Sequence, residues 1–151
     1  MPPRERTLPK TDDEYFERMT KTLFQAGLNW QVIENKWPNF EKAFANFSIP
    51  KVAKFREKQV SSLMTNEGIV RNEKKIRSTI YNAQQSIVIE KEFGSFKDYF
   101  KSFGKNHDKL IADLQSRFEH LGPSSSRTFL WMTGVKLEPT AEEKQWIAAN
   151  K

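Results

Sequence analysis

The sequence contains no cysteine and only two histidines, His107 and His120. Without thiols the chain cannot form a disulfide, a thiolate metal site or a cysteine nucleophile, and two histidines do not form the clusters typical of zinc centres. Both histidines stand in or beside polar helical stretches, where we expect surface or helix-capping roles rather than catalysis. We therefore expect no metal.

Glycine is scarce, with 6 in 151 residues, and neither a phosphate-binding Walker loop nor the glycine pattern of dinucleotide-binding folds is present. No apolar run approaches the roughly 18 residues that a membrane span needs, and no charged-then-apolar signal opens the chain. These absences favour a cytoplasmic protein that works without a bound cofactor.

Aromatic residues and positive charge are abundant instead. The chain has 12 Phe, 4 Trp and 3 Tyr, and its formal net charge is +6. Residues 51–105 carry 12 basic and 6 acidic residues, and this difference of 6 accounts for the whole net charge of the chain. A concentrated positive charge favours an anionic partner. The alternative is a solvated, lysine-rich surface that binds nothing.

The spacing of apolar residues is helical throughout, and no alternating strand pattern competes with it. We expect a flexible arm over residues 1–10 and one all-α domain over 11–151, built from many short helices. Trp37-Pro38 should break or kink the second helix. The expected helices cover 11–26, 29–47, 48–55, 57–66, 72–91, 95–103, 107–120, 124–134 and 139–150.

Two segments combine features that suit a binding surface. The run Gln25 to Trp30 gives a helix end, a glycine turn, an exposed leucine and a tryptophan. The run Gly122-Pro123-Ser124-Ser125-Ser126 places a glycine and hydroxyls before a helix, where free backbone N–H groups favour a phosphate. The second run is equally compatible with an ordinary helix N-cap.

These segments resemble the 3-methyladenine DNA glycosylase I family of the helix-hairpin-helix glycosylase superfamily. Further matches follow in the same order, and the resemblance covers about residues 11–138. They are Trp30 to Phe47, Pro50 to Ala53, Gly68 to Asn72 with Lys75-Ile76 and Asn82-Ala83, and Leu121 to Val135.

The resemblance implies an all-α, helix-hairpin-helix glycosylase-like fold and an activity in base-excision repair of alkylation damage. Such an enzyme extrudes 3-methyladenine from duplex DNA and hydrolyses its N-glycosidic bond, here as a monomer without a Schiff-base lysine. Leu28 would be the wedge that fills the vacated stack, with Gly27 allowing the tight approach. Without the resemblance, Leu28 could equally be a core residue at a helix junction.

The remaining site residues follow from the resemblance, from helical spacing and from the basic segment. Trp30 falls on an aromatic wall of the base pocket, and Tyr15 lies two helical turns before Thr22 on the same face. Lys74 could contact a phosphate or remain solvated. The residues expected to contact DNA are Gly27, Leu28, Arg71, Lys75, Gly122, Pro123, Ser124, Ser125 and Ser126.

The chain also departs from the family pattern. Thr22 stands where the family has a glutamate that contacts the flipped base, and Glu138 is the other candidate for a catalytic group, although it also simply precedes a helix. The zinc ligands of the family are missing, with Pro139 and Glu143 at the late positions. Two alternatives follow: a DNA-binding relative that is non-catalytic or takes another lesion, and a protein interaction module without a nucleic-acid role.

Overall fold

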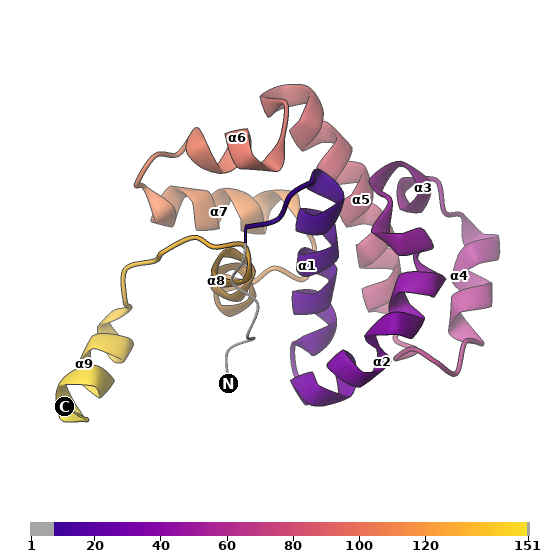
Figure 1. Ribbon diagram of the computed structural model, residues 1–151, viewed down its shortest axis with the longest axis horizontal. Helices are drawn as coiled ribbons and strands as arrows, with labels where there is room; N and C mark the ends of the chain where they lie inside the picture. Colours follow the sequence, from indigo (N-terminus) through magenta and orange to yellow (C-terminus); the bar gives the residue numbers. More distant parts are fainter. Residues whose placement is uncertain (1–7, 151) are drawn as a thin grey trace.

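The computed structural model describes residues 8–150, and this part of the chain is all helical (Figure 1). It contains α1 (Asp12–Gln25), α2 (Trp30–Ala43), the 3-10 turn η1 (Ala45–Phe47), α3 (Ile49–Ala53), α4 (Glu57–Met64), α5 (Glu73–Phe93), α6 (Phe96–Lys101), α7 (His107–Arg117), α8 (Pro123–Met132) and α9 (Ala141–Ala149). The all-α expectation is confirmed. The N-terminal arm expected over residues 1–10 lies mostly outside the described residues.

Most helix boundaries agree with the sequence because local capping sets them. The hydroxyl of Thr11 accepts a hydrogen bond from the backbone N–H of Glu14, and the side chain of Asn72 accepts one from Lys75. Ser95 caps α6 in the same way, through the N–H of Asp98. Each cap satisfies a donor that the first helical turn leaves free.

One of the two courses expected for this segment is wrong, since α2 continues through Pro38 to Ala43 as one helix and is not divided there. Proline there removes one helical hydrogen bond, but Trp37 and Phe40 flank it and are both buried. Their burial on one face offsets that loss. The chain turns later, where residues 45–47 all have positive φ. Smaller differences are that α7 ends at Arg117 and that α9 begins at Ala141, after the Thr140 cap.

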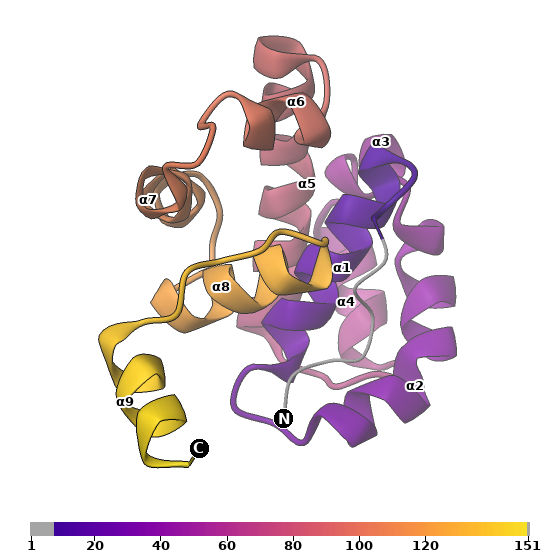
Figure 2. The ribbon, with the colours of Figure 1, turned by 60° about the vertical axis from the view of Figure 1, so that its left-hand side comes forward.

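Helix α1 lies at the centre of the molecule, between α2 on one side and α8 on the other (Figure 2). Two aromatic clusters flank it. One stacks Trp37 on Phe40 and Phe47, and the other stacks Tyr15 on Phe96. The 12 phenylalanines therefore supply much of the core, as the composition suggested.

The first turn of α1 also holds two other helices in place. The carboxylate of Asp12 accepts from the backbone N–H of Phe96, the first residue of α6, at 2.9 Å. Asp13 accepts from the N–H of Ile49, the first residue of α3, at 3.0 Å. Acidic side chains at helix N-termini are favourable because the N–H groups there carry partial positive charge.

A third carboxyl, Glu90 of α5, lies beside this pair. Burial, a hydrogen bond to Asp12 and the negative charges of Asp12 and Asp13 raise the pKa of Glu90 to about 7. Between these two pKa values, Glu90 keeps its proton in the folded chain, whereas in the unfolded chain, with a pKa near 4.3, it has released it. This contribution to stability is complete below the unfolded pKa and is lost as the pH rises through 7.

Replacing Glu90 with glutamine should therefore stabilise the protein at high pH. We expect Glu90→Gln to raise the free energy of unfolding at pH 8 by roughly 1 kcal/mol, allowing for solvent screening of a partly exposed group, and to change it little at pH 4. Urea unfolding at both pH values measures this difference. The control is Glu67→Gln at an exposed carboxylate, and an equal gain at both pH values would contradict the assignment.

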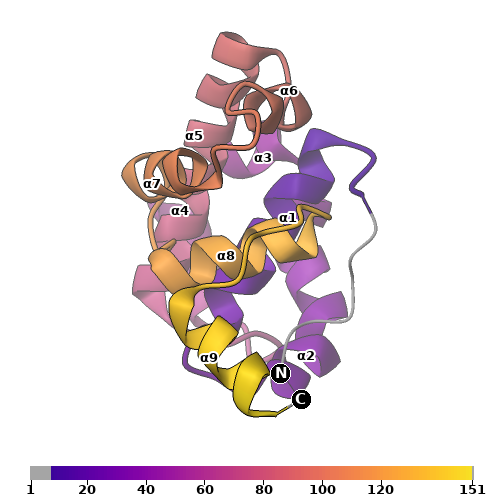
Figure 3. The ribbon, with the colours of Figure 1, turned by 90° about the vertical axis from the view of Figure 1, so that its left-hand side faces the viewer.

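The last helix, α9, extends beyond α8 and buries none of its residues (Figures 1 and 3). The guanidinium of Arg127 on α8 ties it back, through the carbonyl of Glu138 and the carboxylate of Glu143. The two large apolar side chains of this helix, Trp146 and Ile147, are exposed. Among residues 8–150 no helix is both long enough and apolar enough to cross a bilayer.

Candidate functional site

The turn between α1 and α2 presents an apolar side chain to solvent. Gly27 has φ +77°, a left-handed conformation that favours glycine, although no atom stands within 4 Å of where a Cβ would be. Leu28 follows with 45% of its surface exposed, and its N–H donates to the carbonyl of Gln25 at 2.9 Å. The alternative that Leu28 is a core residue is therefore wrong. Asn29 then caps α2 through the N–H of Gln31.

The beginning of α5 lies against this turn. The ammonium group of Lys75 donates to the carbonyl of Ala26 at 2.8 Å and approaches that of Phe24 at 3.5 Å. Burial lowers the pKa of Lys75 from its ordinary value. Arg71 and Lys74 are exposed. Of these basic residues, Arg71 and Lys74 are open to solvent, whereas the ammonium group of Lys75 contacts carbonyls of the protein.

The hairpin between α7 and α8 lies beside the same end of α5. Burial, followed by the positive charges of Lys74 and Lys75, lowers the pKa of His120. His120 has φ +61°, an uncommon conformation for a residue with a side chain, and it precedes the buried Leu121. Gly122 is the N-cap of α8.

Lys75 near the start of α5 contacts the α1–α2 turn, and the hydroxyl of Ser78, one turn later, donates to the carboxylate of Glu119 in the hairpin at 2.7 Å. Helix α5 thus connects the two, and we call the α1–α2 turn, the α5 start and this hairpin together the binding edge.

The serines of the hairpin are not equivalent. Pro123 is the first residue of α8, so the N–H groups of Ser124 and Ser125 fall in the first turn, where a helix offers no acceptor. Ser126 is fully buried, and its hydroxyl donates to the carbonyl of Leu121 at 3.3 Å. The expected contact of Ser126 with DNA therefore has no exposed hydroxyl to make it, because the Ser126 side chain supports the hairpin from inside.

Of the three residues expected in a base pocket, Thr22 and Tyr15 are buried and Trp30 is partly exposed. Thr22 is 3% exposed, and its hydroxyl donates to the carbonyl of Arg18 at 2.9 Å and contacts the sulfur of Met132 at 3.3 Å. Tyr15 is buried against Phe96 and Phe100, and burial raises its pKa. Trp30 is partly buried at the start of α2.

A charge pair between a buried lysine and a partly exposed glutamate near the turn was not anticipated from the sequence. The ammonium of Lys21 pairs with the carboxylate of Glu34 and lies 5.4 Å from the centre of the Trp37 ring. The indole N–H of Trp37 donates to Glu17 at 2.8 Å. Met19 and Leu23, two residues to either side, are fully buried, but residues two apart lie on opposite sides of a helix, so the spacing carried no signal that Lys21 is buried.

Glu138 and the late family positions, Pro139 and Glu143, do not form a metal site in the described part of the chain. Glu138 is exposed, and its carbonyl accepts from Arg127. Pro139 has no ligand atom in its side chain, the carboxylate of Glu143 pairs with Arg127, and the chain has no cysteine. Residues 8–150 contain no group of three or more acidic or histidine side chains arranged for a metal. The residues present do not fit the zinc site that the resemblance implies.

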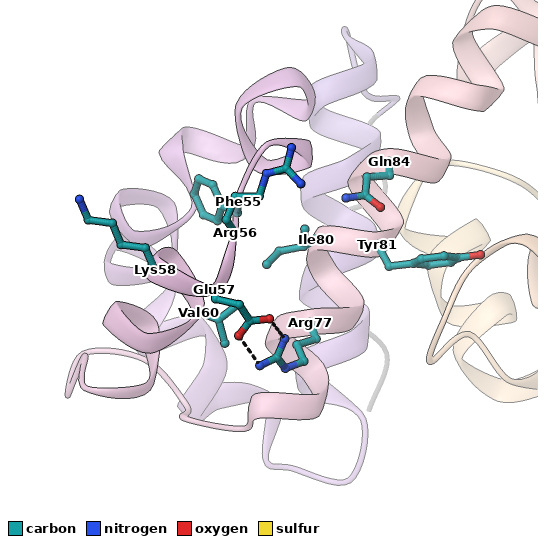
Figure 4. Close-up of a pocket in the computed structure, with 9 residues that line it drawn as sticks. All are labelled: Phe55, Arg56, Glu57, Lys58, Val60, Arg77, Ile80, Tyr81 and Gln84. Carbon is teal, nitrogen blue, oxygen red and sulfur yellow. Dashed lines mark hydrogen bonds and ion pairs between the residues drawn. The ribbon is translucent and has the colours of Figure 1, made fainter.

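A groove of about 490 Å³ lies elsewhere, between α4 and α5 (Figure 4). Arg77 of α5 reaches toward Glu57 of α4 and is held by both carboxylate oxygens of Glu57, at 2.7 and 2.8 Å, and by Glu73 at 3.0 Å. Two carboxylates thus surround the guanidinium. The groove contains none of the expected site residues and is lined by Phe55, Arg56, Glu57, Lys58, Val60, Arg77, Ile80, Tyr81 and Gln84.

Known sequences resemble this chain over most of its length. DNA-3-methyladenine glycosylase 1 of Escherichia coli is 34% identical over 113 residues, 74% of this chain and 60% of that protein. The DNA-3-methyladenine glycosylase of Haemophilus influenzae is 30% identical over 107 residues, 70% of this chain and 57% of its own length. The chain thus spans less than two thirds of these curated relatives.

Solved structures and a family model agree with these matches. The 3-methyladenine DNA glycosylase I of Staphylococcus aureus superposes with a TM-score of 0.78 and 26% identity, covering 92% of this chain and 86% of that one. A variant of 3-methyladenine DNA glycosylase I in complex with 3-methyladenine gives the same TM-score, with 92% and 87% covered. The model for methyladenine glycosylases matches residues 5–127, well over half of the sequence. The chain therefore belongs to the methyladenine glycosylase family.

Proposed function

We propose that this protein is a DNA glycosylase that hydrolyses the N-glycosidic bond of 3-methyladenine in duplex DNA. The observation that carries the proposal is the exposed Leu28 on the Gly27 turn, which Lys75 joins to α5, the helix that also holds the hairpin before α8. A base inside a stack is unreachable for hydrolysis, so the enzyme needs a wedge and a grip on the backbone. Family membership supports the same assignment.

The binding edge supplies the grip. The N–H groups of Ser124 and Ser125 at the start of α8 are suited to a phosphate, since a helix N-terminus carries partial positive charge. Arg71 and Lys74 are exposed nearby, in the segment that carries the excess positive charge. Affinity for duplex DNA should accordingly fall steeply as salt rises.

The extruded base requires an aromatic surface more than an acid. 3-Methyladenine in DNA is cationic, and stacking on Trp30 would contribute about 0.5–2 kcal/mol by cation–π attraction. Breaking the glycosidic bond returns its electron pair to the methylated base, which leaves neutral, while water adds hydroxyl to the sugar carbon and releases a proton. Because this base is a good leaving group, positioning accounts for much of the rate.

Thr22 supports a second candidate function. Its hydroxyl already bonds within the protein, and it cannot offset positive charge as the glutamate of the family pattern would. Glu138 is exposed on the segment before α9 and remains the other candidate for a carboxylate at the reaction. On this alternative, the chain is a DNA-binding relative that is non-catalytic or takes another lesion.

Base release separates the two functions. The purified protein is incubated with duplex DNA carrying N-methylpurines, and released bases are measured by chromatography for wild type, Thr22→Glu and Thr22→Val. We expect wild type to release 3-methyladenine, with Thr22→Val retaining most of that activity because the hydroxyl bonds within the protein. Release by Thr22→Glu but not by wild type would favour the non-catalytic relative. If neither wild type nor Thr22→Glu released 3-methyladenine, another lesion would be favoured.

The setting of this activity is proposed with it. We expect the enzyme to act in the cytoplasm, as a monomer, on duplex DNA with an alkylated base and without a cofactor. Binding that does not depend on salt would point instead to the protein interaction module.

A further inference from the structure

The last turn of α1 contains no basic residue that could balance the partial negative charge of its free carbonyls. Backbone carbonyls there carry partial negative charge, which a basic residue in the last turn commonly balances. Lys75, which is 49 residues beyond Ala26, supplies that positive charge from α5 through its 2.8 Å hydrogen bond to the Ala26 carbonyl.

We propose that Lys75 is a positioning residue that fixes the Gly27 turn so that Leu28 points at DNA. The inference rests on the proposed function. The Ala26 carbonyl belongs to the peptide group that joins Ala26 to Gly27, and its orientation sets ψ of Ala26, 121°, and φ of Gly27, +77°. On the other side of the turn, the Leu28 N–H is bonded to Gln25. The turn is thus fixed by two contacts that leave the Leu28 side chain exposed.

The backbone of Lys75 is held in place and its side chain is partly buried. A lysine that binds phosphate on an open surface has neither constraint. Its backbone N–H donates to the side chain of Asn72, and its carbonyl accepts from the hydroxyl of Thr79 at 2.8 Å. Its side chain is partly buried, and burial lowers its pKa. Lys74, one residue earlier, is exposed. The two adjacent lysines therefore form a matched pair with equal charge and different contacts.

The comparison of Lys75→Met with Lys74→Met tests the proposal. Binding is measured by fluorescence anisotropy on two duplexes, one undamaged and one with a stable abasic-site analogue. Lys75→Met should weaken binding to the abasic duplex about tenfold and binding to the undamaged duplex less than threefold. Lys74→Met should weaken both equally and lower the salt dependence by about one phosphate contact. Lys75→Arg should recover most of the loss.

A double-mutant cycle with Leu28→Ala shows whether Lys75 acts through the wedge. If it does, Lys75→Met adds little to the loss that Leu28→Ala already causes. Additive losses, or equal losses on both duplexes with a reduced salt dependence, would overturn the proposal and make Lys75 a phosphate contact.

Amide hydrogen exchange of the free protein gives a readout that does not need DNA. The Leu28 amide should exchange at least tenfold faster in Lys75→Met, while amides in the middle of α5 remain protected. Unchanged exchange at Leu28 would overturn the positioning role. If wild type shows no preference for the abasic duplex, the proposed function fails, and the exchange result still decides whether Lys75 holds the turn.

Discussion

Replacing Leu28 by alanine should weaken binding to an abasic duplex by about tenfold. Full burial of a leucine side chain gains about 1.5–3 kcal/mol, and Leu28, which is 45% exposed, gains roughly half of that in the space left by a base, most of which alanine forgoes. Excision of 3-methyladenine should fall in parallel, because the wedge keeps the base out of the stack. Anisotropy titrations and single-turnover base release measure the two losses.

The fold should not change in this variant, since the Leu28 side chain is exposed. Ile147→Ala is the matched control, because Ile147 on α9 is 44% exposed, against 45% for Leu28. The control should leave both DNA affinity and thermal stability unchanged. Equal affinities of wild type and Leu28→Ala for the abasic duplex would remove the wedge role.

Replacing Trp37 by alanine should lower the free energy of unfolding by about 3–5 kcal/mol, the cost typical of removing a buried large aromatic side chain. Trp37 is 6% exposed and stacks on Phe40 and Phe47. The same ring faces the ammonium of Lys21, and its N–H bonds to Glu17. Truncation therefore leaves a cavity and also removes a donor from a buried polar cluster. Urea unfolding measures the loss.

A second tryptophan provides the control for this measurement. Trp146 on α9 is 67% exposed, so Trp146→Ala should change stability by less than about 0.5 kcal/mol. If Trp37→Ala cost no more than Trp146→Ala, the aromatic stack of α2 would not be a main source of stability.

Helices could be located from the sequence because their determinants are local. Thr11, Asn72 and Ser95 cap the helices that follow them, as their side chains suggest. The apolar stripe of α5 faces the core for the same reason, since helical spacing places its members on one side. Whether α2 continues through Pro38 could not be decided in this way, because it depends on the packing of Trp37 and Phe40 against rings outside the helix, Phe47 and Phe24.

In the candidate site, too, features set by adjacent residues could be predicted, whereas contacts between distant residues could not. The exposed glycine turn and the helix start at Pro123 follow from a few adjacent residues. The contact of Lys75 with Ala26 joins residues 49 apart, and nothing in the sequence near either residue indicates it. Likewise, Tyr15 and Thr22 share a helix face, but only the packing of α6 and α8 shows that both side chains are covered.

The central place of α1 has a consequence for how the chain folds during synthesis. Arg18 donates to the carbonyl of Met132, a contact that spans 114 residues, and Asp12 reaches Phe96 across 84. At translation rates of about 5–20 residues per second, α1 waits on the order of ten seconds for the helix that covers it. Until α8 emerges, the face of α1 that carries Arg18 and Thr22 lacks its partner Met132. One face of the most central helix therefore stays uncovered until nearly the whole domain has been made.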